Sequence, residues 1–213
     1  MELFERAKAI MFNPKEEWKI IEAENASHGK VFAGYLLILA LIPTVAIFIS
    51  YCWKWYSASH GLVGFFDSPY LKLGIAVAVQ PFVIILVGAY LSAAVINAFS
   101  DQFGSAKDLN RAFSLVAYSY TPMCVAGILF IFGPLAAFVP YVGLYGLVLL
   151  YFGIEAQLKP SADKKIICFI ITLITALVAW IILSKIVPVI SQSILEEMAK
   201  SNSNDAIRNM MPR

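Results

Sequence analysis

The chain is far more apolar than a soluble protein of its length. Of its 213 residues, 60% are hydrophobic and only 14% are charged, whereas soluble domains average about 45–50% and about 25%. The formal net charge is +2, and no basic stripe marks a nucleic-acid-binding surface. Composition therefore excludes an ordinary soluble domain and argues against nucleic acid as a partner. We expect the lipid bilayer to surround most of this chain.

Residues 1–30 are predicted to form an amphipathic interfacial region made of two short helices. Asn13 suits the N-cap of the second helix, Pro14 its first position, and Glu16 the capping-box position. A helix that binds a partner protein would show the same pattern, so both interpretations stand. The first helix has apolar side chains at helical spacing, namely Leu3, Phe4, Ala7, Ile10 and Met11, with Glu2, Glu5, Arg6 and Lys8 on other faces.

Five long apolar runs follow the N-terminal region. At about 1.5 Å per helical residue, each is long enough to cross a hydrocarbon core about 30 Å thick. None alternates as a barrel strand does, so we expect helices. The predicted fold class is an all-α membrane protein, a bundle of about five transmembrane helices preceded by short amphipathic interfacial helices. The membrane domain (31–190) would hold spans at 31–53, 71–99, 112–132, 134–154 and 166–190, and a polar C-terminal tail would occupy 191–213.

The third and fourth spans are divided only by glycine and proline, because residues 112–154 contain no Asp, Glu, Lys or Arg. Proline fits the first turn of a helix, so a tight hairpin at Gly133-Pro134 is one interpretation. A turn over residues 133–140 is the other. Both interpretations keep two crossings.

Lysine and arginine residues beside the spans predict the orientation of the bundle. Ten of them flank the side that carries the N-terminus, and six flank the opposite side. The N-terminus is therefore predicted to be cytoplasmic. With an odd number of spans, the C-terminus is predicted to lie outside.

The sequence contains no recognised catalytic, metal or cofactor motif. HExxH, GxSxG, the P-loop and the glycine fingerprint of dinucleotide binders are all missing. We therefore predict no enzyme activity, no cofactor and no metal site. Cys52, Cys124 and Cys168 each lie in or beside an apolar run and are interpreted as buried thiols.

Polar side chains within or at the ends of the spans form the candidate site. Such groups are costly in lipid and tend to face the bundle interior. On the predicted topology, the ends of the second and fourth spans and a polar tract of the third lie near the same side, so we expect one polar cluster. A purely structural use is the alternative, because Tyr collects at interfaces and Ser or Thr hydroxyls bond to their own helix. The cluster comprises Asn97, Asp101, Tyr118, Tyr120, Thr121, Pro122 and Glu155.

Four short motifs stand out along the chain: Asn13-Pro14 with Trp18, Ala117–Pro122, Gly143–Gly146 and Tyr151–Ile154. They resemble motifs of the Yip domain family, integral membrane proteins named as Ypt/Rab-interacting proteins in eukaryotes and also widespread in bacteria. The resemblance extends over most of the chain in the order and spacing of its spans. It implies five spans with a cytosolic N-terminus, and it carries over Tyr120, Thr121 and Pro122 from the family's Tyr-Thr-Pro tract.

The missing catalytic motifs and this resemblance together predict a non-enzymatic membrane scaffold or adaptor, in a bacterial cytoplasmic (inner) membrane. Its partners would be other membrane proteins or further copies of the same chain. The alternative is transport of a small solute, an ion or a lipid, with the Tyr-rich third and fourth spans lining a path. Few ionisable groups lie inside the spans to serve such a path. An intramembrane enzyme is a third and more distant hypothesis.

Overall fold

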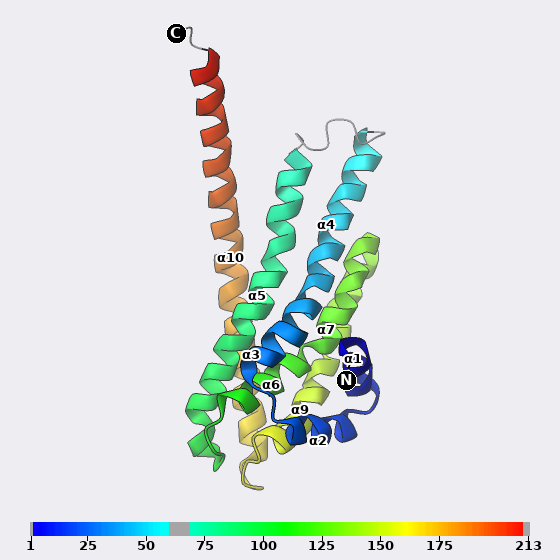
Figure 1. Cartoon of the computed structure of the whole chain (residues 1–213), viewed down its shortest axis with the longest axis vertical. Coiled ribbons are helices and arrows are strands. Elements are labelled where there is room, and N and C mark those ends of the chain that lie inside the picture. The colour runs from blue at the N-terminus through cyan, green and yellow to red at the C-terminus, as the bar shows by residue number, and fades with distance from the viewer. Residues whose placement is uncertain (1, 60–68, 211–213) are drawn as a thin grey trace.

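The structure, a computed structural model, describes residues 2–59 and 69–210, and every regular element in these residues is a helix (Figure 1). The last helix continues well past residue 190, where the final span was predicted to end. In chain order the elements are α1 (Leu3–Phe12), α2 (Pro14–Glu24), α3 (His28–Val31), the π-helical turn η1 (Phe32–Leu36), α4 (Leu37–Ser59), α5 (Pro69–Phe99), the 3₁₀ turn η2 (Ser100–Phe103), α6 (Leu109–Ser119), α7 (Thr121–Ala126), the 3₁₀ segment η3 (Gly127–Phe138), α8 (Val139–Gly143), α9 (Tyr145–Gln157) and α10 (Lys165–Met210).

Four helical stretches of the described chain are long and apolar enough to cross a membrane: His28–Ser57, Leu71–Phe103, Leu109–Gln157 and Lys165–Ser193. Their outer faces carry large apolar side chains that no described part of the chain covers, such as Ile174, which is 54% exposed. A continuous surface of this kind would aggregate in water, whereas lipid solvates it. The predicted class, an all-α membrane protein, is confirmed.

The third of these stretches is a helical hairpin rather than a single crossing. At about 1.5 Å per residue its 49 residues would reach about 70 Å, more than twice the hydrocarbon thickness. The backbone leaves helical geometry at Gly133, where φ is +56° and ψ is −91°. The two arms then lie side by side: a Cβ on Gly146 would be 2.6 Å from the carbonyl oxygen of Ser119, and one on Gly143 would be 3.6 Å from Met123. Five helical arms therefore run through the described part of the bundle. In chain order they are His28–Ser57, Leu71–Phe103, 109–132, 133–157 and Lys165–Ser193.

The N-terminal helices α1 and α2 pack against the lower end of the bundle in Figure 1. Trp18 of α2 is only 1% exposed. It fits against α9 because Gly153 has no side chain there, and a Cβ at that position would lie 2.5 Å from the indole ring. The hydroxyl of Tyr145 donates to the carbonyl oxygen of Met11 at 2.7 Å and ties the end of α1 to α9. Both short helices are thus held directly on the spanning helices.

The start of α2 matches the sequence expectation in position but not in its capping. The helix begins at Pro14, whose fixed φ suits the first turn. The predicted capping box is not formed, because Asn13 makes no side-chain capping hydrogen bond. Glu16 instead forms an exposed ion pair with Lys19 at 3.0 Å, so the proline rather than the cap defines this helix start.

Candidate functional site

A buried ion-pair network links α1 to α2 beside the bundle. Arg6 is 5% exposed and Glu17 is 3% exposed, and the guanidinium donates to Glu17 Oε1 at 2.6 Å. Its other terminal nitrogen pairs with Glu24, which shares a face of α2 with Glu17 because the two are about two turns apart. Burial, the largest single effect, disfavours the charge on Arg6, but the hydrogen bond to Glu24 and the charge interactions with Tyr118, Glu24 and Glu17 together outweigh it, so the pKa of Arg6 is raised. Arg6 is therefore a permanent cation held between two carboxylates.

Next to this network lies a cluster of hydroxyl groups and aromatic rings in the bundle core. The hydroxyl of Thr121 donates to the carbonyl oxygen of Tyr118 at 2.7 Å. It has one proton to give, so Tyr35 must donate to Thr121 Oγ1 across their 2.7 Å contact. The rings of Tyr35 and Tyr118 have centroids 4.5 Å apart, and Trp18 meets Tyr118 edge-on at 6.0 Å. Tyr118 thus joins the core cluster to the N-terminal helices.

Two irregular turns bring these side chains together. The helix of the third arm breaks between Ser119 and Thr121, because Pro122 lacks the N–H that would continue the ladder. In the first arm, η1 is a π-helical turn, a rare feature that is frequent at functional sites. This turn carries Tyr35, whose hydroxyl meets Thr121 at the break. The hydrogen bond therefore joins the irregular points of two different arms.

A cavity of about 270 Å³ opens beside the two tyrosines. Its walls come from α1, the end of α2, the connection between α2 and α3, α3, η1 and α6. Charged, aromatic and apolar side chains all line it, so it suits a ligand that is both polar and apolar. In the described residues, no three His, Cys, Asp or Glu side chains lie close enough together to hold a metal ion. The polar residues of its wall are Arg6, Glu24, Lys30, Tyr35 and Tyr118, and Gly34 also lines it.

The structure brings three members of the predicted polar cluster together and directs a fourth elsewhere. Tyr118 and Thr121 are buried side by side, and Pro122 is fully buried at the same helix break. Tyr120 faces another side of the arm, since residues two apart on a helix are rotated by roughly 200°.

The remaining members of the predicted cluster lie outside this core. Asp101 pairs with Lys107 at 2.7 Å, and Glu155 pairs with Lys165 at 2.5 Å. Both carboxylates are on the surface, with side chains 64% and 72% exposed. Asn97 is half-buried, and its Oδ1 has no hydrogen-bond partner in the described part of the chain. Each acidic residue is thus neutralised locally by a lysine and does not reach the tyrosines.

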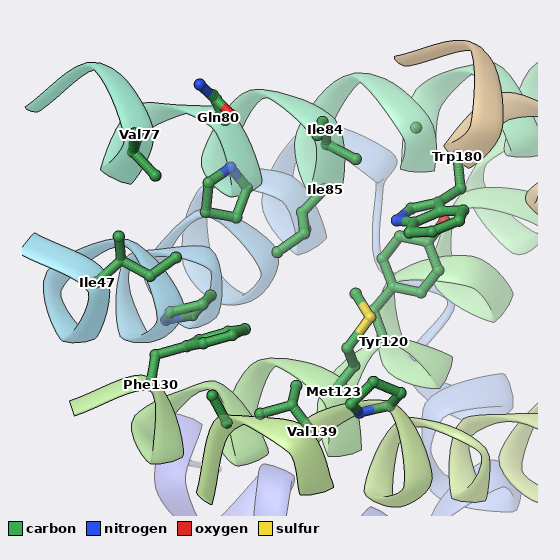
Figure 2. A pocket seen from close by; sticks show the side chains of 15 residues that line it. Ile47, Val77, Gln80, Ile84, Ile85, Tyr120, Met123, Phe130, Val139 and Trp180 are labelled. Carbon is green, nitrogen blue, oxygen red and sulfur yellow. The ribbon is translucent and has the colours of Figure 1, made fainter. Parts of the chain in front are cut away.

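Tyr120 lines a separate apolar cavity of about 400 Å³ between α4, α5, the hairpin and α10 (Figure 2). Figure 2 shows Tyr120 next to Met123 on the side of the cavity that Trp180 covers. Trp180 is itself 53% exposed, so this side of the cavity lies near the outer face of the bundle. A second apolar cavity of about 300 Å³ shares Tyr120, Met123 and Trp180. The two cavities are therefore neighbouring lobes on either side of these three residues.

Sequence reasoning missed two residues at the centre of the buried site. The amphipathic pattern placed Phe4 on the apolar face and Arg6 on a polar face, but Phe4 is 78% exposed and Arg6 is buried. Tyr35 was missed because it lies in an otherwise apolar span. One signal was available: Glu17 and Glu24, two turns apart on the same short helix, form an acidic face to which a basic residue of α1 can pair.

A helical bundle with apolar outer faces and a short N-terminal unit packed on it defines a multi-pass integral membrane protein. The family model described as the Yip1 domain matches residues 8–183. The chain belongs to the Yip1 domain family, which confirms the resemblance seen in its motifs. No curated protein and no solved structure matches the chain. The matched range contains Glu17, Glu24, Tyr35 and the Tyr118–Thr121 pair, while Arg6 lies just before it.

Proposed function

We propose that this Yip1 family protein is a non-enzymatic membrane scaffold that presents its N-terminal helices to other membrane proteins or to a second copy of itself. It would sit in a bacterial inner membrane, crossing it five times, with the N-terminus in the cytoplasm and the C-terminus outside. The observation that carries the proposal is the docked N-terminal unit: the buried Arg6 network joins α1 to α2, and Trp18 against Gly153 and the Tyr145–Met11 hydrogen bond hold the unit on the spans. A segment held in this way is pre-organised for binding.

The fixed N-terminal unit offers an exposed aromatic surface. Phe4 is 78% exposed and Phe12 is 74% exposed, both on α1, and Ile20 on α2 is 45% exposed. Large aromatic side chains are enriched at the centres of protein interfaces, where they bury much area at a low entropic cost. Their exposure on a rigidly docked helix supports a docking role, with these side chains as the contact points.

Photo-crosslinking in cells tests the scaffold function. A photoreactive amino acid is placed at Phe4 or Phe12, and at Lys19 of α2 as a control that is 68% exposed. We expect the same discrete product, a heteromeric partner or a dimer, from both phenylalanine positions and not from Lys19. Diffuse or absent products at both positions, in cells where the protein is present at normal levels, would rule out the scaffold function.

Lipid or small-solute translocation is the second candidate, and the 400 Å³ cavity favours it. The cavity is lined almost entirely by apolar side chains, so it fits a lipid better than an ion. Purified protein in vesicles is assayed for lipid and solute flux, with Tyr120→Ala beside the wild type. Flux that exceeds that of empty vesicles and changes in the variant would support translocation. A flux no greater than that of empty vesicles would rule out translocation.

A further inference from the structure

The 270 Å³ cavity lies where the first membrane-crossing stretch begins. His28 is the first residue of that stretch, and Lys30, Val31 and Gly34 of its first two turns line the cavity. Residues at the start of a span lie at the level of the lipid headgroups. The cavity therefore lies at the depth of the bilayer where lipid headgroups and glycerol groups surround the protein.

The charges on the cavity wall are of both signs. Arg6 is already paired with Glu17 and Glu24, and Glu17 is buried behind it. The carboxylate of Glu24 remains 43% exposed. Lys30, which is exposed, makes no ion pair with any residue that the structure describes. The four charges sum to zero, so the cavity offers one accessible anion and one accessible cation without a net charge.

The shape of the cavity depends on the π-helical turn and on one glycine within it. A Cβ built on Gly34 meets no atom within 4 Å, although the residue lines the cavity. A π-helical turn is rare and is often found where a helix wall accommodates a ligand. The same turn places the buried ring of Tyr35 against the cavity. Gly34 therefore lies on the cavity wall without packing against another helix, and a larger side chain there would extend into open space next to the cavity.

We propose that this cavity binds the headgroup of a zwitterionic phospholipid that carries a primary ammonium and a phosphodiester, namely phosphatidylethanolamine. The ammonium donates to Glu24, and the phosphate lies by Lys30. The glycerol region rests on the apolar wall that Leu3 and Val31 supply. A primary ammonium has N–H donors for a carboxylate, whereas a choline headgroup has none, and phosphatidylglycerol has no cation to neutralise Glu24.

Native mass spectrometry of the full chain tests the proposal. The protein is reconstituted in vesicles of equal parts phosphatidylethanolamine, phosphatidylcholine and phosphatidylglycerol, then extracted gently, and its retained lipids are identified. We expect phosphatidylethanolamine to be enriched roughly tenfold over the other two lipids among those retained. One charge-assisted hydrogen bond favours the lipid that makes it by about this ratio. Retained lipids in the proportions of the vesicle, or enriched in either other lipid, would overturn the proposal.

Two pairs of variants localise the binding to this cavity. Gly34→Leu fills the open space and should abolish the enrichment, while Gly29→Leu, whose added side chain also starts in open space but does not line the cavity, should retain it. Glu24→Gln keeps an acceptor for Arg6 and makes the cavity net positive, so retention should shift toward phosphatidylglycerol. Glu16→Gln, an exposed carboxylate on the same helix, is its control. Unchanged enrichment in Gly34→Leu, or equal behaviour of Glu24→Gln and Glu16→Gln, would contradict the assignment.

Discussion

Removal of the buried cation of the N-terminal network is the sharpest perturbation of this structure. Arg6→Met keeps the apolar stem of the side chain but leaves Glu17 without its partner. Because Glu17 is 3% exposed, its carboxylate must then stay charged in a buried position, take up a proton, or become exposed as α1 separates from α2 and the two helices leave the spans. We expect the helices to detach.

The expected size of the effect follows from burial. Removing one partner of a buried ion pair costs about 3–5 kcal/mol. The Glu16–Lys19 pair on α2 has the same chemistry, but its side chains are 73% and 68% exposed, and such pairs contribute only about 0–1 kcal/mol. At about 1.4 kcal/mol per factor of ten, Arg6→Met should increase local opening roughly a hundredfold to a few thousandfold. Lys19→Met should change it by less than about tenfold.

Hydrogen–deuterium exchange of the protein in lipid nanodiscs measures this opening. Backbone amides in peptides from α1 and α2 should exchange faster in Arg6→Met, while those of α5 remain unchanged. Adding Glu17→Leu should restore most of the protection, because no buried charge is then left without a partner. If Arg6→Met exchanges no faster than Lys19→Met, the network does not hold the N-terminal helices in place.

Two further pairs of substitutions test close packing and the buried hydroxyl chain. Gly153→Ala would place a Cβ 2.5 Å from Trp18. The resulting overpacking should destabilise the protein by about 1–3 kcal/mol and lower its thermal unfolding temperature. Gly29→Ala, where no atom lies within 4 Å of the added Cβ, should leave the unfolding temperature unchanged. Thr121→Val removes the acceptor of the Tyr35 hydroxyl and leaves that buried hydroxyl unpaired, which costs about 1–3 kcal/mol of stability. In Tyr35→Phe the threonine hydroxyl keeps its backbone acceptor. The valine variant should therefore unfold at the lower temperature. The opposite order in thermal unfolding would show that the hydrogen-bond directions are wrong.

The helical membrane fold was predictable because its signal is the local density of apolar residues. The absence of charge over residues 112–154 dictates helices in lipid whatever the rest of the chain does. The reversal within that run depends on a backbone conformation at Gly133, with φ of +56°, that glycine adopts without a Cβ penalty. The composition of the run shows that two helices are present, whereas their packing depends on which glycines face the partner arm.

The candidate site was only partly predictable, because its key contacts join distant parts of the chain. Arg6 has the local pattern of a solvated residue, and its burial depends on carboxylates of a second helix. Glu155 has the pattern of an intramembrane acid, but Lys165 across the following turn neutralises it at the surface. Helical geometry alone would have separated Tyr118 from Tyr120, since roughly 200° lies between them. Periodicity in the third arm could thus have separated these two tyrosines, while the pattern of the first helix alone did not show that Arg6 is buried against another helix.

We propose that the docked N-terminal helices form the surface through which this protein acts. Photo-crosslinking from Phe12 in three backgrounds tests it directly: the wild type, Arg6→Met, and Arg6→Met combined with Glu17→Leu. We predict a discrete crosslinked product in the wild type, its loss in the single variant, and its return in the double variant. A product that persists unchanged when hydrogen exchange shows α1 and α2 detached would contradict the claim.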